Sequence, residues 1–409
     1  MNKIKRSLLV TFDFSQRGKS GTGLAAGSLL SACRNHPLYN SHFTVTHLAI
    51  EMSTDTEMMP TVNDIFNKID AEVNLRSLNA LALSCYVWSS ALIEPLIKLC
   101  RSSGFKGNII LGGYQIMKKN GEKLYPSGDI YIPGYAESAL PIAFLKGTIL
   151  SKLVLDVPVD FETLSSPYLD GTITLIQNQE MIHWETQRGC KFKCNFCAHR
   201  DLLGDQVEVF GMDKIKQELD LFKIRQVKKI NVLDPVFNLG LNHLEILKYA
   251  KLINLNSLLV FQVRFELITD EFLNLCRDLN VHLEFGLQTA VKKEFKTIQR
   301  PNHLKKVSEN IHRLKNLNQS FEVSLIYGLP NQTPESFLES IEFLKLRGVE
   351  MIKAFPLMLL EGTDLARDKE KFNIVEDIID DSGIPHVVAC DSFTREQWET
   401  MRVYANQLT

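Results

Sequence analysis

Three cysteines lie close together near the middle of the chain, at the spacing C-x3-C-x2-C. They are Cys190, Cys194 and Cys197, and they follow an apolar run and precede a helical one. Thiolates this close in sequence can converge on one metal centre without ligands from distant parts of the chain. Three ligands leave one iron of a four-iron cluster open to a substrate or cofactor, whereas a cluster with four thiolates usually only carries electrons. The segment therefore predicts a metal centre with its own chemistry.

A zinc site is the main alternative for this segment. Three thiolates and the imidazole of His199 form a known structural zinc set, although the short step from Cys197 to His199 strains a tetrahedron. Buried structural cysteines are disfavoured because Lys191, Lys193 and Asn195 make the segment a polar loop. A disulfide is disfavoured by the odd number of cysteines in this segment and by the reducing compartment that we expect.

With Phe196 as the aromatic residue, the segment resembles the C-x3-C-x-aromatic-C signature of the radical S-adenosylmethionine (radical SAM) enzymes. The resemblance implies a [4Fe-4S] cluster on Cys190, Cys194 and Cys197, whose fourth iron chelates SAM through its amino and carboxylate groups. One electron, from a donor such as flavodoxin or ferredoxin, would cleave SAM to methionine and a 5'-deoxyadenosyl radical, which abstracts hydrogen from the substrate.

Length and composition describe an ordinary globular protein. The 409 residues suffice for two or three domains, and the apolar and charged contents are 45% and 23%. A net charge of -2 gives no support for a nucleic-acid partner. No apolar run reaches the roughly 20 residues that span a bilayer, and the start of the chain lacks a signal-type apolar core. We therefore expect a cytoplasmic protein with no membrane partner, whose five other cysteines are reduced core thiols.

The first part of the chain alternates short apolar runs with helical stretches. Strands separated by helices predict a parallel sheet with helices on both faces, and ligands of such sheets bind beyond the carboxyl ends of the strands. The predicted strands are 7–12, 43–50, 80–84, 108–111 and 129–132.

The turn after the first of these strands resembles the D-x-H-x-x-G loop of cobalamin (B12)-binding domains, matching at Asp13 and Gly18. Ser84, Gly112 and Gly113 fall where that family keeps its serine and its paired glycines. The resemblance implies that these residues face a cobalamin in a Rossmann-like domain.

Ser15 is a departure from that pattern, because it replaces the histidine that would ligate cobalt. Serine is no useful cobalt ligand, so histidine-on binding is excluded if the loops are equivalent. Cobalamin bound without a protein ligand is compatible with the sequence, and so is a domain that kept the fold and lost the cofactor. We favour the empty domain.

From residue 181 strands and helices alternate again, six times. The predicted strands are 182–188, 229–233, 257–265, 281–287, 321–327 and 351–359. Six units are too few for a closed eight-stranded barrel, but they suit the partial (βα)6 barrel that the radical SAM resemblance implies. The loops after each strand then converge on one active-site mouth.

Several of these loops resemble the SAM-binding elements of the family. Asp234 stands where many members carry a Gly-Gly-Glu turn, and the resemblance carries over only the position. Glu284 and Gln288 are candidates for the ribose hydroxyls. Arg300 is a candidate for the SAM carboxylate, which a guanidinium fork fits well.

Tyr327 and Gly328 belong to a fifth-strand segment that resembles the one packing on adenine. His199, Tyr327 and Lys353 are candidates for moving a proton, chosen by their position in the loops. For each single residue a surface or core role is the alternative, whereas their order along one barrel favours a shared site.

The chain is predicted to be α/β, with an N-terminal doubly wound parallel-sheet domain of the cobalamin-binding type and a radical SAM partial barrel. The predicted parts are the first domain at 1–147, a connector at 148–180, the barrel at 181–365 and a short C-terminal helical extension at 366–409.

The function we predict first is hydrogen abstraction from a small, natural-product-type molecule, followed by elimination, epimerisation or rearrangement. Cobalamin-dependent methyl transfer is the alternative, and it shares every barrel residue. A non-catalytic zinc or iron-sulfur protein is a weaker one.

Overall fold

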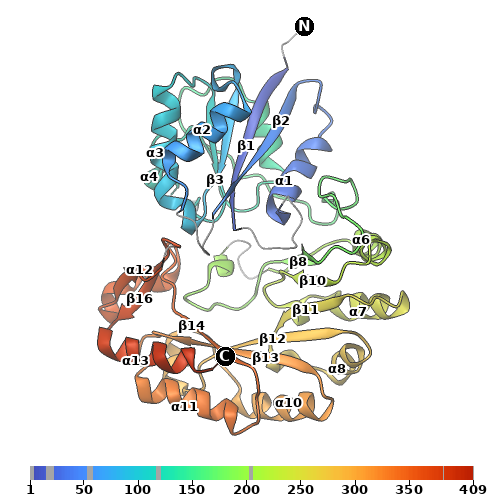
Figure 1. Ribbon diagram of the computed structural model, residues 1–409, viewed down its shortest axis with the longest axis vertical. Helices are drawn as coiled ribbons and strands as arrows, with labels where there is room; N and C mark the ends of the chain where they lie inside the picture. The colour runs from blue at the N-terminus through green and yellow to red at the C-terminus, as the bar shows by residue number, and fades with distance from the viewer. Residues whose placement is uncertain are drawn as a thin grey trace. The chain divides into compact units, whose positions relative to one another are not determined.

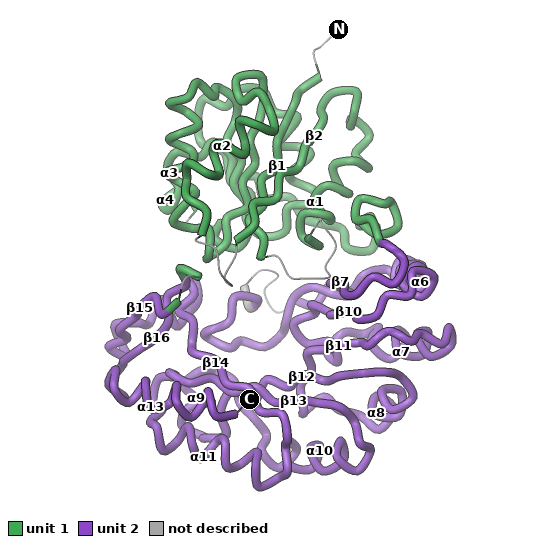
Figure 2. The backbone as a smooth tube through the Cα atoms, in the orientation of Figure 1, with its two compact units in different colours: residues 1–175, 380–383 green, residues 176–379, 384–409 purple. Residues whose placement is uncertain are grey.

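The computed structural model describes residues 4–14, 23–52, 59–116, 121–201, 206–380 and 382–408. The chain divides into two compact units, which Figure 2 shows in green and purple. The first comprises residues 1–175 and 380–383, and the second comprises residues 176–379 and 384–409.

Six parallel strands form the sheet of the first unit, in the order β2-β1-β3-β4-β5-β6. Figure 1 labels the first three of them, β2, β1 and β3. The strands are β1 (Lys5–Asp13), β2 (Phe43–Glu51), β3 (Ala80–Ser84), β4 (Asn108–Gly112), β5 (Ile130–Ile132) and β6 (Leu153–Val154). The helices are α1 (Leu24–Arg34), α2 (Val62–Glu72), α3 (Ser90–Ser102), α4 (Gly121–Leu124) and α5 (Ala139–Leu145).

The burial of β1 explains why this sheet needs helices on both faces. Leu8 and Val10 belong to a core cluster with Ile65 of α2, whereas Leu9, between them, belongs to a second cluster with Leu30 of α1. Successive side chains of a strand point to opposite faces, so a continuous apolar run requires cover on each. The doubly wound fold predicted from the sequence is confirmed.

The stretch 148–180 differs from the connector that the sequence suggested. Residues 148–175 group with the first unit, and β6 extends its sheet by pairing with β5. Ile173 is buried, and a Cβ on Gly27 of α1 would lie 2.5 Å from it. A two-residue strand gives too little periodicity to be predicted from sequence.

The second unit contains a six-stranded parallel sheet in the order β14-β13-β12-β11-β10-β7. Its strands are β7 (Met181–Trp184), β10 (Lys229–Val232), β11 (Leu258–Val263), β12 (Val281–Gln288), β13 (Ser320–Tyr327) and β14 (Ile352–Pro356). Its helices are α6 (Met212–Ile224), α7 (His243–Leu252), α8 (Asp270–Arg277), α9 (Lys292–Thr297), α10 (Leu304–Asn316) and α11 (Pro334–Lys345). Figure 1 shows α7, α8, α10 and α11 along the outer side of the strands.

Strand β12 shows how this sheet separates a helix-packed face from an inner face. Its residues alternate between buried and half-buried. Leu283 and Phe285 are buried on the helix side, whereas His282, Glu284 and Gln288 lie on the other face. The inner face of the partial barrel is therefore polar at β12.

Two helix starts follow the capping signals in the sequence. Thr333 accepts a hydrogen bond from the backbone N–H of Ser336, and Pro334 opens α11. Thr269 likewise accepts from the backbone N–H of Phe272 at the start of α8.

The first strand of the barrel is shorter than the predicted 182–188. β7 ends at Trp184, and β8 (Gln187–Arg188) pairs antiparallel with β9 (Glu208–Val209) instead. The chain thus leaves the parallel sheet just before the three cysteines.

The sequence predicts a helical extension at 366–409, but the structure places two strands there as well. β15 (Val375–Ile378) and β16 (Pro385–Ala389) form an antiparallel pair, preceded by α12 (Asp364–Arg367) and followed by α13 (Arg395–Asn406). Every residue of β15 is exposed, so no apolar alternation marked it in the sequence. Among the described residues, no helix is long and apolar enough to cross a membrane.

Candidate functional site

The loop with the three cysteines is fixed to the barrel through the residue after Cys194. Cys190 and Cys194 are buried and Cys197 is half-buried. Asn195 donates its backbone N–H to the carbonyl of Ile298 at 3.1 Å, and its side-chain amide to the carbonyl of Thr297 at 2.9 Å. Its own carbonyl accepts the backbone N–H of Leu365 at 2.9 Å. No sequence signal indicates this role, since asparagine in a polar loop is ordinary.

Asp234 fixes the segment that leads into the loop. It follows β10, is fully buried, and accepts the backbone N–H of Thr186 at 2.8 Å and that of Gln187 at 3.3 Å. Burial raises the pKa of Asp234 to about 7. The side chain of Asp234 is therefore occupied by hydrogen bonds within the chain, and it anchors this segment.

Burial governs the protonation of the cysteines. It raises the pKa of the Cys197 thiol to about 11 and also raises that of Cys190. A backbone hydrogen bond from Phe192 and the charges of Arg264 and Arg300 act in the opposite direction on Cys190. Metal ligands must be thiolates, so loading of a metal centre here would release protons.

Arg300 brings the predicted SAM-binding residues of β12 next to this loop. Its Nη1 lies 3.5 Å from Sγ of Cys194, and its Nη2 donates to the carbonyl of Gly286. A Cβ on Gly286 would lie 3.3 Å from Nη2 of Arg300 and 2.5 Å from Nε2 of Gln288. A side chain at Gly286 would displace the end of the Gln288 side chain, and the structure brings Gln288, Arg300 and Cys194 together.

A second guanidinium that the sequence reasoning missed lies at the same place. Arg264 follows β11 and is 4% exposed, with its Cζ 3.8 Å from the ring centroid of Phe192 in the cysteine loop. Its position directly after a barrel strand was the available signal, but a single arginine there is usually a surface residue.

The residues around the loop fit an anionic cofactor. Nη1 of Arg264 and Nε of Arg300 are buried without a hydrogen-bond partner among the described residues. Buried donors are nearly always satisfied, so a group that accepts from them is expected. A thiolate-ligated [4Fe-4S] cluster and the SAM carboxylate are both such groups, and Cys190, Cys194 and Cys197 would hold the cluster.

A zinc site fits less well. In the described part of the chain, a single group of three or more His, Cys, Asp or Glu side chains has ligand atoms all within 4.8 Å of one another, and it contains no cysteine. Thiolates around one zinc ion lie about 3.8 Å apart in a tetrahedron. His199, on the 3-10 helix η3 (Ala198–Asp201), is exposed.

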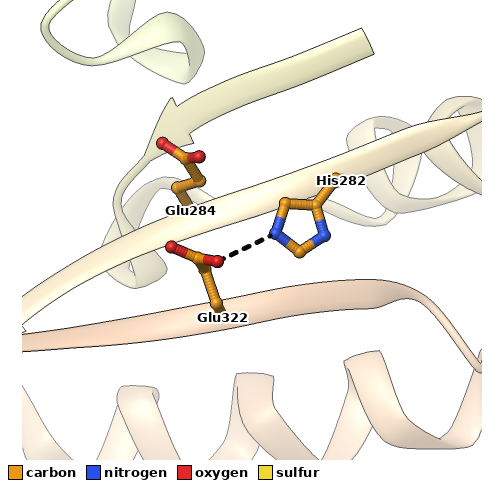
Figure 3. A group of neighbouring side chains, drawn as sticks. All are labelled: His282, Glu284 and Glu322. Atoms are coloured by element: carbon orange, nitrogen blue, oxygen red, sulfur yellow. Dashed lines mark hydrogen bonds and ion pairs between the residues drawn. The ribbon is translucent and has the colours of Figure 1, made fainter. Parts of the chain in front are cut away.

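That group is His282, Glu284 and Glu322, on the inner face of β12 and β13 (Figure 3). Nε2 of His282 lies 3.3 Å from Oε2 of Glu322, and Nζ of Lys353 lies 2.7 Å from the same oxygen. Because Lys353 already neutralises Glu322, we interpret the group as a charge network. The predicted residues Glu284 and Lys353 therefore both lie at this network on the inner face. The sequence did not indicate its other two members, His282 and Glu322.

The pKa values of the two carboxylates in this network, Glu322 and Glu284, are shifted in opposite directions. Hydrogen bonds from His282 and Lys353 lower the pKa of Glu322, whereas burial and the neighbouring Glu322 raise the pKa of Glu284. The two are register partners on adjacent strands, and no ion pair or hydrogen bond is found for Glu284 among the described residues. Glu284 is thus the carboxylate left available on the inner face.

Tyr327 and Gly328 are placed differently from the prediction. The ring of Tyr327 lies 5.8 Å from that of Phe337 in α11 and 5.5 Å from that of Trp398 in α13, and burial raises its pKa to about 12. A Cβ on Gly328 would lie 3.0 Å from the carbonyl oxygen of Val387. Both residues contact the helices and the C-terminal segment, on the face opposite to Glu322. Phe196 is half-buried within the cysteine loop.

In the first unit, the predicted residues line the carboxyl edge of the sheet. Ser84 accepts the backbone N–H of Phe12 at 3.2 Å, and Asp13 accepts the hydroxyl of Thr11 at 2.6 Å. Gly113 has a φ of 103°, and a Cβ there would lie 2.9 Å from the Cys85 carbonyl. Ser15 and Gly18 lie outside the described residues.

The same edge carries no bulky side chain at β4. A Cβ on Gly112 would have only atoms of Ile132 within 4 Å, at 3.7 and 3.9 Å. Among the described residues, the end of β4 therefore leaves space next to Gly112, at the edge where such sheets bind cofactors.

The sequence profile of the radical SAM superfamily matches residues 184–344. This stretch contains the cysteine loop and both arginines that converge on it. Residues 184–344 of this chain form a radical SAM domain. The family implies a [4Fe-4S] cluster and SAM as cofactors, in agreement with the sequence prediction.

Two curated relatives of this radical SAM enzyme are methyltransferases by name. The 2-(S-pantetheinyl)-carbapenam-3-carboxylate methyltransferase of Streptantibioticus cattleyicolor is 23% identical over 336 residues. The cobalamin-dependent radical SAM methyltransferase TokK of Streptomyces tokunonensis is 22% identical over 334 residues. Each match covers 70% of this chain and 48% of the relative, so the chain spans about half the length of the curated relatives it matches.

Solved structures resemble this radical SAM enzyme over nearly its whole length. The methyltransferase TsrM from Kitasatospora setae, with tryptophan and a SAM analogue bound, matches with a TM-score of 0.72 at 12% identity, covering 99% of this chain and 89% of TsrM. The cobalamin-dependent enzyme OxsB matches with a TM-score of 0.69 at 14% identity, covering 98% of this chain and 66% of OxsB. These likenesses confirm the predicted fold, a cobalamin-binding-type domain with a radical SAM partial barrel.

Proposed function

We propose that this radical SAM enzyme transfers a methyl group from SAM to a small molecule, with cobalamin as the methyl carrier. The observation that carries the proposal is the resemblance to the two curated methyltransferases, which extends over 70% of the chain. Hydrogen abstraction followed by elimination, epimerisation or rearrangement, which we first predicted, therefore becomes the second candidate.

The first unit supports a cobalamin site without a protein ligand to cobalt. Among the described residues, its carboxyl edge has space next to Gly112, and the side chain of Ser84 at that edge is only a small hydroxyl. Ser15, in place of histidine, gives no cobalt ligand. Cobalamin would therefore rest on the edge through shape and hydrogen bonds alone.

The barrel supports the SAM half of the reaction. When bound, the cluster, SAM and cobalamin supply the electron-transfer and methyl-transfer chemistry. Arg264 and Arg300 provide buried positive charge beside the cysteines, Gln288 lies next to Arg300, and Glu284 offers the inner face an unpaired carboxylate. An electron donor such as flavodoxin or ferredoxin is part of this proposal.

A cobalamin-retention experiment tests the proposal. Anaerobically reconstituted protein is loaded with hydroxocobalamin, desalted and examined by visible absorption, and then given SAM with a deuterated methyl group and a panel of small natural-product-type acids and amino acids. We expect retained cobalamin and a product heavier by one labelled methyl group.

A pair of glycine variants makes the test specific. A Cβ at Gly112 meets only ordinary contacts, so Gly112→Val should fold yet occupy the open edge and abolish retention. Gly147→Val is the matched control, because no atom lies within 4 Å of a Cβ there. Cleavage of SAM to 5'-deoxyadenosine without cobalamin would instead support the second candidate, and no cleavage under reducing conditions would support a non-catalytic protein.

A further inference from the structure

Arg264 is a buried cation whose described neighbours do not satisfy all of its hydrogen-bond donors. Its side chain is 3% exposed, and its Nη1 has no hydrogen-bond partner among the described residues. Nε lies 3.3 Å from Oε2 of Glu266, and Nη2 lies 3.5 Å from the carbonyl of Pro301, a long contact. A buried guanidinium with an unsatisfied N–H group is costly unless a further acceptor is present.

The charges around Arg264 also indicate that a further anionic group belongs beside it. Burial and the positive charge of Arg300 both lower the pKa of Arg264, and Glu266 acts against them. Two guanidinium groups repel each other at a buried site unless anions lie beside them. Besides Glu266, the anion-forming side chains there are the thiols, and Arg300 already contacts Cys194.

The contact with the cysteine loop is direct. The guanidinium carbon of Arg264 lies 3.8 Å from the ring centroid of Phe192, within cation–π range. Phe192 stands between Cys190 and Cys194, so this stacking couples Arg264 to the turn that joins two of the three ligands. The contact fixes where the positive charge sits relative to the thiolates.

We propose that Arg264 is a positioning residue for the iron–sulfur cluster, whose fixed charge favours the reduced cluster and whose stacking on Phe192 holds the turn between Cys190 and Cys194. Reduction adds negative charge, and a nearby cation in a buried site stabilises it, because cluster potentials depend on local charge and hydrogen bonding. The inference rests on the radical SAM cluster and not on methyl transfer.

An EPR-monitored redox titration of the reconstituted full-length enzyme tests this, first without SAM. Arg264→Met removes the charge and keeps an apolar side chain, whereas Arg264→Lys keeps the charge and loses the planar stack. For Arg264→Met we expect the ratio of reduced to oxidised cluster at a fixed potential to fall about tenfold, which corresponds to 59 mV for a one-electron couple. Arg264→Lys should restore most of that ratio.

Phe192→Leu removes the ring on which Arg264 stacks and leaves the charge of Arg264 in place. It should leave the potential near that of the wild type while broadening the EPR signal, because the loop is held less firmly. If Arg264→Met does not load the cluster, Arg264→Gln, which is also uncharged, is titrated against Arg264→Lys. A smaller reduced fraction in Arg264→Gln at the same potential supports the role of the charge, and equal fractions in the two variants overturn it.

Two further outcomes overturn the proposal. One is a wild-type potential in Arg264→Met. The other is a potential that changes only when SAM is present, together with weaker SAM binding, which would make Arg264 a SAM contact instead. None of these readouts depends on cobalamin or on a methylated product, so failure of the proposed function would leave this test unaffected.

Discussion

The carboxylate of Asp234 holds the backbone of Thr186, accepting its N–H at 2.8 Å and its hydroxyl as well. The same carboxylate accepts the N–H of Gln187 at 3.3 Å. These bonds join the carboxyl end of β10 to the segment that leaves β7 for the cysteine loop. Three donors in a fully buried place depend on this single side chain.

Loss of this acceptor should destabilise the enzyme and its metal centre together. Asp234→Ala leaves two buried N–H groups unsatisfied, and we expect a loss of about 3 kcal/mol in the free energy of unfolding. Asp234→Asn keeps an acceptor oxygen and should lose about 1 kcal/mol. Denaturant unfolding and the iron content after reconstitution measure both effects. Equal stability of the two variants would contradict the anchoring role.

The raised pKa of Asp234 predicts a pH dependence of stability. With a folded pKa of about 7 and an unfolded value near ~3.9, its protonation contributes stability fully below about pH 4, and this is lost as the pH rises through about 7. Measured against Asp234→Asn, the wild type should gain about 1 kcal/mol on going from pH 8.5 to pH 6. Thermal unfolding of both proteins across this range checks it, and a constant difference would refute it.

The three cysteines should be individually required for iron. We expect Cys190→Ala, Cys194→Ala and Cys197→Ala each to lose the cluster absorption and all SAM cleavage. Cys390→Ala is the matched control, because Cys390 is half-buried like Cys197 but lies in the C-terminal segment. Iron and sulfide content with EPR measure the outcome. One zinc ion in place of about four irons would revive the zinc interpretation.

Arg300 should matter for SAM more than for folding. Arg300→Met removes a charged hydrogen-bond donor beside Cys194 and Gln288, and we expect SAM to bind about 10- to 100-fold more weakly. Arg347→Met is the control, because Arg347 stacks on Phe343 in the outer helix layer with its Cζ 3.5 Å from the ring centroid. SAM affinity of the reconstituted enzymes, followed by the change in the EPR signal, separates the two. Equal affinity in both would remove Arg300 from the SAM site.

The sheet and helices of both units could be predicted from the sequence, because the patterns that indicate strands and helix ends involve neighbouring residues. Apolar runs predicted the long strands, and Thr333 with Pro334 predicted the start of α11, since caps and periodicity depend on neighbouring residues. β6 and β15 were missed for the same reason, because one is two residues long and the other has no buried residue.

The candidate site was only partly predictable, because side-chain direction and strand register are not local. Glu284 was chosen from its strand, but its neighbour Glu322 emerges only from the register of β12 with β13. Tyr327 was chosen for its place at a strand end, and the alternation of β13 turns it toward the helices. Arg264 was missed because burial, which makes it informative, cannot be seen from one residue's sequence position.

Glu322 and Glu284, which are neighbours on adjacent strands of the barrel, should change the free energy of unfolding in opposite directions when each is replaced by glutamine. Glu322→Gln removes the charge that pairs with Lys353 at 2.7 Å and contacts His282, so we expect it to lower the free energy of unfolding by about 1 kcal/mol. Glu284→Gln removes a partly buried charge whose largest interaction with another charged group is repulsion from Glu322, because like charges on paired strands are unfavourable. It should be neutral or stabilising by about 0.5 kcal/mol. The side chains are isosteric, so volume cannot explain a difference. Denaturant unfolding at pH 7.5 measures both, and a loss at Glu284 as large as at Glu322 would show that Glu284 has a partner in the free enzyme.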